Sequence, residues 1–404
     1  MKIGRNAPCL CNSGKKYKKC CMRKTEEQKM AEAIADIQPI IRKQGHIKQC
    51  LHPNKAECKG GIIRAHAIQN NRVLSRIAEN GHVTMLDGTS FLIFQDAQTK
   101  GRKIATMFTG FCSYHDKVLF QAIEDIDFTA TQKQIFLLTY RTMAWHYHKK
   151  QEQAKQNEIM IQQMAEHGFA LKQDRNKNLF LHSLDLGLSD NEIKKDEFDQ
   201  ALINCDYEKV HSRIWELPYE VQFAVSMQFE PSFDLQGNQI GDYQNEKECL
   251  RSIYLNIFPV QGKSFCIWSW LAADDGVFSP FAEQFMALDV IDRENFLNNK
   301  LPAGTDAIVI SPVLWKKWGN PIQQALITHA NFGSLYQIHE IEDGGHPYQF
   351  MYTPWNLFES VASEPNTLSQ LSGNNTEHYA KHPIAFFLML RYTFQEEVAQ
   401  YGIQ

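Results

Sequence analysis

The first 24 residues contain four cysteines whose spacing suits a single metal ion. One residue separates Cys9 from Cys11, and the adjacent pair Cys20 and Cys21 follows eight residues later. Zinc takes four soft ligands tetrahedrally, and a closed shell of cysteines leaves no position open for catalysis. The spacer begins with turn-forming residues, so the chain can reverse and bring the second pair back to the first. The spacing predicts one structural zinc ion on these four cysteines.

The stretch from Gly4 to Cys21 closely resembles the SEC-C motif, a small zinc module named from the C-terminal tail of the SecA translocation motor. That family usually has Pro and Gly where this chain has Leu10 and Asn12, and neither position is a ligand. The resemblance implies an accessory module that contacts proteins or ribosomal and acidic surfaces, and therefore zinc-dependent docking rather than a reaction. A role in translocation or ribosome-associated quality control would rest on this analogy alone.

Charge is distributed unevenly along the chain. Residues 1–24 carry eight lysines and arginines and no acid, a net charge of +8. The whole chain has a net charge of −4, so residues 25–404 carry −12. A positive segment on an acidic body can steer toward nucleic acid or an acidic protein surface. We therefore expect protein or nucleic-acid partners to bind through the basic residues 1–24.

A second set of cysteines and histidines follows between residues 46 and 128. We expect a second closed zinc site formed by Cys50, Cys58, Cys112 and His115, with His52 as an alternative ligand. Two ligands on an early loop, then strands, then a C-x-x-H pair at a helix start is the arrangement of a treble clef. The N-terminus of a helix suits a thiolate because its free N–H groups favour negative charge.

Residues 46–128 also resemble the HNH nucleases. In that family a histidine on the first strand after the zinc loop is the general base. The resemblance implies this role for His66 and a metal-binding role for Asp116, with Mg²⁺ or Mn²⁺ as the catalytic ion. His66 would then activate water for attack on a phosphodiester.

Several features of the HNH pattern are missing here. Ala65 stands beside His66 where the family has a second Asp or His, and the middle Asn is represented only by the nearby Asn70 and Asn71. His66 could instead be a core histidine or a zinc ligand, and Asp116 could simply favour the dipole of its helix. The nuclease is therefore the alternative to docking.

Hydrophobic periodicity predicts the elements that position these residues. We expect helices over 25–44, 71–79, 130–168 and 190–204, with Thr25 and Gln28 forming a capping box. Alternation of apolar and polar residues over 221–229 predicts a half-buried strand. Further strands are expected over 82–86, 91–95, 104–108, 252–258, 264–270 and 307–310, and mostly helices from residue 280 onward.

Together these patterns indicate a multi-domain α+β protein with an antiparallel β-containing C-terminal body. No apolar run approaches the roughly 20 residues of a membrane span, and no N-terminal signal is evident. Clustered cysteines without an export signal favour metal binding in a reducing, bacterial cytoplasm. The predicted segments are a SEC-C module (1–24), a connecting helix (25–45), a treble-clef or HNH-like unit (46–128), a helical segment (129–216) and an α+β domain (217–404).

Overall fold

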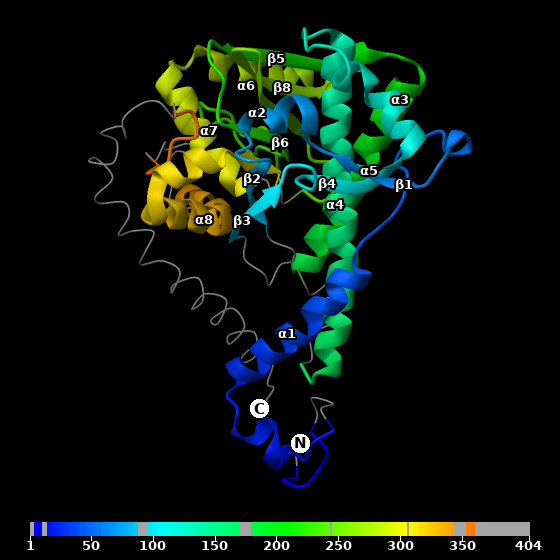
Figure 1. The fold of residues 1–404 in the computed structure, drawn as a ribbon, viewed down its shortest axis with the longest axis vertical. Helices are drawn as coiled ribbons and strands as arrows, with labels where there is room; N and C mark the ends of the chain where they lie inside the picture. The colour runs from blue at the N-terminus through cyan, green and yellow to red at the C-terminus, as the bar shows by residue number, and fades with distance from the viewer. Residues whose placement is uncertain are drawn as a thin grey trace.

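The computed structural model describes residues 4–9, 14–87, 96–169, 179–242, 245–304, 307–342 and 353–359. Cys11 and the expected strand over 91–95 lie outside these residues. The fold is mixed helix and antiparallel sheet, as predicted (Figure 1). None of the described helices combines the length and the apolar character needed to cross a membrane.

Two helices form a stalk that joins the N-terminal module to the body (Figure 1). Helix α1 (Glu26–Gln44) packs on the far half of α4 (Gln132–Glu166), and buried aliphatic and methionine side chains fill the contact. The predicted capping box of Thr25 and Gln28 is confirmed at the start of α1. At about 1.5 Å per residue, the 35 residues of α4 extend about 50 Å, so the helix reaches well beyond the sheet.

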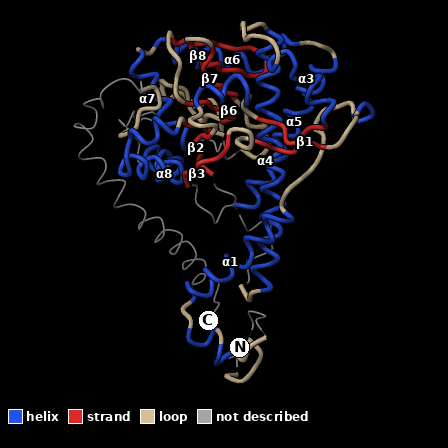
Figure 2. The backbone as a smooth tube through the Cα atoms, viewed as in Figure 1, coloured by secondary structure: helices blue, strands red, loops and turns tan. Residues whose placement is uncertain are grey.

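The body is built on a seven-stranded sheet, whose strands are drawn in red in Figure 2. All of its described strand pairs are antiparallel. Its strand order is β3-β2-β9-β6-β7-β8-β5. The strands are β2 (His82–Asp87), β3 (Asp96–Gly101), β5 (Val210–Leu217), β6 (Phe223–Phe229), β7 (Ile253–Val260), β8 (Lys263–Leu271) and β9 (Ile308–Ile310).

Helices cover both faces of this sheet. One hydrophobic cluster joins the sheet to α3 (Ser113–Glu124), α4 and α5 (Leu179–Ile203). A second, rich in Trp and Phe, joins the opposite face to α6 (Asp275–Ala287), α7 (Val290–Gly304) and α8 (Pro312–Glu342). The prediction that the strand over 221–229 is half-buried was therefore wrong, since every residue of β6 is buried. Its polar positions face α4 and α5, where Ser226 donates to Thr142 and Gln228 donates to Asn191.

A second, two-stranded sheet lies beside α3. Strand β1 (Ile62–His66) pairs antiparallel with β4 (Met107–Cys112), and α3 follows β4 directly. The strand expected over 104–108 therefore begins later, because residues 102–106 form a turn. The helix expected over 71–79 is a π-helical turn (Asn70–Leu74) followed by the short α2 (Ser75–Ile77).

The large sheet draws on three of the five predicted segments. Strands β2 and β3 come from residues 46–128, β5 from 129–216 with its last residue beyond, and the other four from 217–404. Strands β2 and β3, which lie between β1 and β4 in the sequence, thus belong to the large sheet, while β1 and β4 form the small one. The segment boundaries stay a prediction, but the three segments share one sheet.

Candidate metal centres

The N-terminal module brings three of its four cysteines together. The ligand atoms of Cys9, Cys20 and Cys21 all lie within 4.8 Å of one another, and the Sγ atoms of the adjacent pair are 3.8 Å apart. The reversal predicted for the spacer is present, because the Cys9 N–H donates to the Lys15 carbonyl (2.8 Å) and Pro8 bridges to Lys16. These three cysteines could hold a metal ion.

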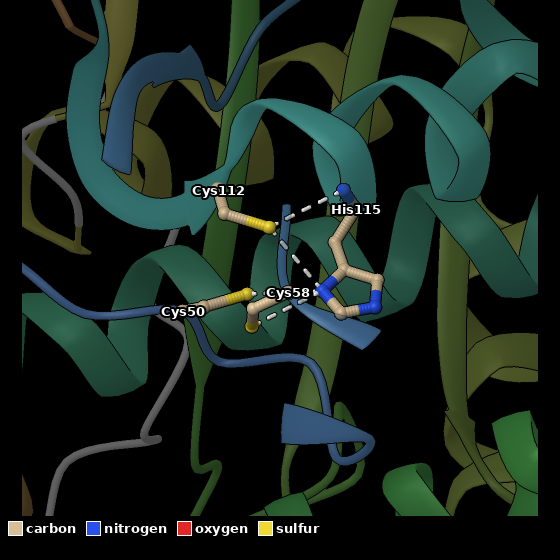
Figure 3. Close-up of side chains that lie close together, drawn as sticks. All are labelled: Cys50, Cys58, Cys112 and His115. Carbon is tan, nitrogen blue, oxygen red and sulfur yellow. Dashed lines mark hydrogen bonds between the residues drawn. The ribbon is translucent and has the colours of Figure 1, made fainter. Parts of the chain in front are cut away.

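The second centre brings together Cys50, Cys58, Cys112 and His115 (Figure 3). His115 Nδ1 lies 3.4 Å from the Sγ atoms of Cys50 and Cys112 and 3.6 Å from that of Cys58. All four ligand atoms lie within 4.8 Å of one another, and each faces the same point. The set expected from the sequence is therefore a candidate site for one metal ion.

Cys50 is positioned by hydrogen bonds on both sides of it. The Gln49 N–H donates to the Thr109 carbonyl (3.1 Å), and the Leu51 N–H donates to the Gly110 carbonyl (2.7 Å). This extended segment thus follows β4 and places Cys50 near the end of that strand.

Helix α4 holds the residues just before Cys50. The carboxylate of Glu152, which is 4 % exposed, accepts from the Ile47 N–H (3.1 Å) and from the ring of His46 (3.2 Å). His148 Nε2 lies 3.0 Å from the Ile47 carbonyl, so this nitrogen carries the donated proton. The segment that follows α1 is therefore held to the body by the buried carboxylate of Glu152 and the buried imidazole of His148.

The other half of the centre is built on the start of α3. Cys112 is the N-cap residue, and its Sγ accepts from the His115 N–H (3.5 Å). Burial alone would raise the pKa of the Cys112 thiol, but the backbone N–H of His115 and a backbone hydrogen bond from Lys59 hold that pKa below its usual value. The helix start thus favours the thiolate, which is the form that binds metal.

A tight turn places Cys58 beside Cys50, Cys112 and His115. Gly60 has φ +73, a backbone conformation that favours glycine, and a Cβ added there would lie 2.2 Å from Ser113 Oγ, so that hydroxyl would have to rotate away. Desolvation, then the neighbouring thiols of Cys50 and Cys112, raises the pKa of Cys58 to about 11. Three thiolates this close repel one another, so a bound cation is needed to stabilise all of them.

His52, the alternative ligand, is not part of the four-residue cluster. Its ring stacks on that of His115, with centroids 3.8 Å apart and planes 7° apart. Burial, then the nearby His115 and Lys55, lowers the pKa of His52 to about 4. A neutral His52 therefore supports the His115 ring by stacking.

His66 and Asp116 lie at the end of β1 and in the first turn of α3. No hydrogen bond or ion pair joins them in the part of the chain that the structure describes. Burial lowers the pKa of His66 and raises that of Asp116, and both respond to the ion pair of Arg141 with Glu124 (2.6 Å). The structure thus places both candidates near a half-buried ion pair and does not show the HNH-like resemblance.

Comparison with known proteins concerns the N-terminal module. The family model described as "SEC-C motif" matches residues 5–23. The protein translocase subunit SecA of Desulforudis audaxviator is 69% identical over 26 residues, which is 6% of this chain and 3% of that protein. SecA 1 of Rhodopirellula baltica is 78% identical over 23 residues, 6% of this chain and 2% of that protein. No solved structure matches the chain. Residues 5–23 are therefore a SEC-C motif with cysteines positioned to hold a metal ion, on a chain that spans only a few per cent of these relatives.

Proposed function

We propose that this protein is a zinc-stabilised docking protein whose basic SEC-C module recruits a protein or nucleic-acid partner. The observation that carries the proposal is the position of the module. Among the described residues, it lies at the end of the stalk formed by α1 and α4, away from the sheet and its helices (Figure 1). The described residues of the body therefore do not cover the module.

The distances within both centres support zinc. A tetrahedral zinc ion, with bonds of about 2.3 Å to sulfur and 2.0–2.1 Å to nitrogen, separates a sulfur from a nitrogen ligand by about 3.6 Å and two sulfurs by about 3.8 Å. The second centre has sulfur to nitrogen distances of 3.4, 3.4 and 3.6 Å, and the adjacent cysteines of the module are 3.8 Å apart. We propose one ion in each centre, with Cys11 as the fourth ligand of the N-terminal centre. The order of loop, β1, β4 and α3 supports a treble clef around the second.

The charge of the module supports a negatively charged partner. Arg5, Lys15, Lys16, Lys19 and Arg23 are exposed, and residues 1–24 contain no acid to neutralise them. The rest of the chain carries −12, so the module and the body have net charges of opposite sign. This asymmetry favours the approach of an anionic surface to the module rather than to the body.

The nuclease alternative gains no support from the comparisons or from the described residues. His66 and Asp116 are absent from both metal-ligand clusters of the described residues, no hydrogen bond joins them, and the Nε2 of His66 is buried without a partner among those residues. Docking is the better-supported function.

The test compares two triple variants that remove the same charge. In Lys15→Gln, Lys16→Gln, Lys19→Gln the module loses three exposed lysines and keeps its cysteines and backbone hydrogen bonds. The control variant changes three exposed lysines of the body: Lys117→Gln, Lys209→Gln and Lys247→Gln.

Binding is measured by fluorescence anisotropy on labelled duplex DNA, single-stranded RNA and poly-glutamate over a range of salt concentrations. The salt slope for duplex DNA is about 0.9 per phosphate contact, so the module variant should lose up to about 2.7 of that slope. The control should match wild type. Equal binding by both variants, or no binding of any of the three probes by wild type, would reject the proposal.

A further inference from the structure

The four ligand residues of the second metal centre differ in their exposure to solvent. Cys50 is 7 % exposed, Cys112 is 1 % exposed and His115 is 2 % exposed. Cys58 is exposed, and so is every other residue of its loop, residues 54–61. A small reagent in solution can therefore reach Cys58, while the body shields the other three ligand residues.

The exposed loop holds Cys58 beside a buried thiol. The Cys58 N–H donates to the Lys55 carbonyl (3.2 Å), and the Lys55 ammonium donates to the Cys50 carbonyl. The Sγ atoms of Cys58 and Cys50 lie within 4.8 Å of each other (Figure 3). The two sulfurs of a disulfide are about 2.05 Å apart, so a movement of less than about 3 Å brings these atoms to bonding distance.

These features are the ones that make a cysteine reactive toward peroxide. Such a cysteine is accessible, is present as the thiolate, and lies next to a second thiol that can form a disulfide with it. The loop supplies the access and Cys50 supplies the second thiol. A zinc ion in the centre supplies the third condition, because zinc binds cysteine in the thiolate form.

We propose that Cys58 is a site of reversible oxidation by hydrogen peroxide, and that a disulfide between Cys58 and Cys50 opens the second metal centre. Cys112 is not the partner, because its sulfur caps α3 by accepting from the His115 N–H (3.5 Å). The inference rests on the zinc ion proposed for this centre and does not depend on what the SEC-C module binds.

The reaction has two steps on the side chains of Cys58 and Cys50. The Cys58 thiolate attacks one oxygen of the peroxide, the O–O bond breaks, and the hydroxide that leaves takes a proton from solvent to form water. The Cys50 thiolate then attacks the sulfur of the Cys58 sulfenic acid. The S–S bond forms, the S–O bond breaks, and a second hydroxide is protonated to water. The two thiolates lose two electrons, which reduce one peroxide, and the two ligand residues that remain are too few for a closed zinc site.

The first measurement locates the disulfide in the full-length protein after treatment with hydrogen peroxide. Free thiols are alkylated, and the protein is then unfolded and digested with trypsin. Cleavage after Lys48, Lys55 and Lys59 places Cys50 and Cys58 on separate peptides, 49–55 and 56–59. We expect these two peptides to be linked in the oxidised protein, and dithiothreitol with added zinc to restore the lost ion. A loss of zinc that dithiothreitol does not reverse would overturn the proposal.

The second measurement follows zinc release with a colorimetric chelator. The full-length chain carries Cys20→Ser and Cys21→Ser, so that all the released zinc comes from the second centre. On this background Cys58→His keeps a zinc ligand but has no thiol, so peroxide should release its zinc at least about tenfold more slowly. Cys205→Ser is the matched control, because Cys205 is exposed but lies outside both metal clusters of the described residues. It should release zinc at the rate of the background.

Equal rates of release from Cys58→His and Cys205→Ser would show that oxidation does not begin at Cys58. If Cys58→His holds no zinc, the peptides of the wild-type protein decide: an alkylated Cys58 after zinc release, or a disulfide between Cys50 and Cys112, refutes the proposal. A second centre without zinc before oxidation would refute the proposal together with the zinc assignment. A bound ion that peroxide does not release would refute the proposal alone.

Discussion

Replacing Cys58 with serine separates metal binding from packing. Cys58 is exposed, so its substitution removes little buried surface. An exposed substitution without a special role changes the free energy of unfolding by no more than about 0.5 kcal/mol. A large effect would therefore have to come from the cluster in which Cys58 Sγ lies 3.6 Å from His115 Nδ1.

The expected size of the effect follows from the ligand count. Structural zinc binds zinc-finger peptides with about 10–16 kcal/mol, so one ligand in four contributes about 3 kcal/mol. For a body of this size, such a loss lowers Tm by roughly 6–12 °C. The variant should also hold one zinc ion fewer than wild type, and a chelator should lower the Tm of wild type toward that of the variant.

Cys205→Ser is the matched control, because Cys205 is also exposed and lies outside both metal clusters. Unfolding is followed by calorimetry and metal content by mass spectrometry on the same samples. If Cys58→Ser keeps its full metal content and a Tm within about a degree of Cys205→Ser, the second centre is not a metal site and the reasoning fails.

Two further predictions concern the surroundings of this centre. Glu152→Ala should lower stability by about 1–3 kcal/mol in denaturant unfolding, because it leaves the Ile47 N–H without its acceptor. Burial raises the pKa of Glu152, but the nearby Lys149 and His148 and the Ile47 N–H together hold it below its usual value. The stabilisation is therefore complete above about pH 5 and is lost as the pH falls below 4.5. A difference in stability between variant and wild type that grows on acidification would contradict this prediction. Gly60→Ala should lower Tm somewhat more than Gly262→Ala, because both glycines have positive φ but a Cβ at Gly60 would also push the Ser113 hydroxyl away from its hydrogen bond to the Lys59 carbonyl. Equal losses of Tm would show that the close contact at Gly60 does not restrict the turn.

Local features of the fold were predictable from the sequence. The capping box of α1 depends on residues three positions apart, and the ends of α4 lie within two residues of the predicted ones. The grouping of Cys50, Cys58, Cys112 and His115 as candidate ligands could be predicted because metal ligands must be of a few residue types and reach one point. His52 was an equally good ligand by type, and only its stacking on His115 shows its actual place.

Long-range pairing was not predictable in the same way. The sequence over 82–86 predicts a strand but does not say that it pairs with β9, more than 200 residues later. The polar positions of β6 indicate a solvent face, and they are buried only because α4 and α5 supply partners for them. The exposure of Cys58 beside three buried ligand residues also results from the packing of separate segments, so no local pattern marks it.

Zinc content and zinc coordination of the wild-type protein test the central claim most directly. We predict two zinc ions per chain by mass spectrometry. X-ray absorption at the zinc edge should average about 3.5 sulfur ligands near 2.3 Å and about 0.5 nitrogen near 2.0 Å, the mean of one site with four cysteines and one with three cysteines and a histidine. One ion per chain, or a shell dominated by oxygen, would contradict the account of two closed centres and of a zinc-stabilised module at the end of the stalk.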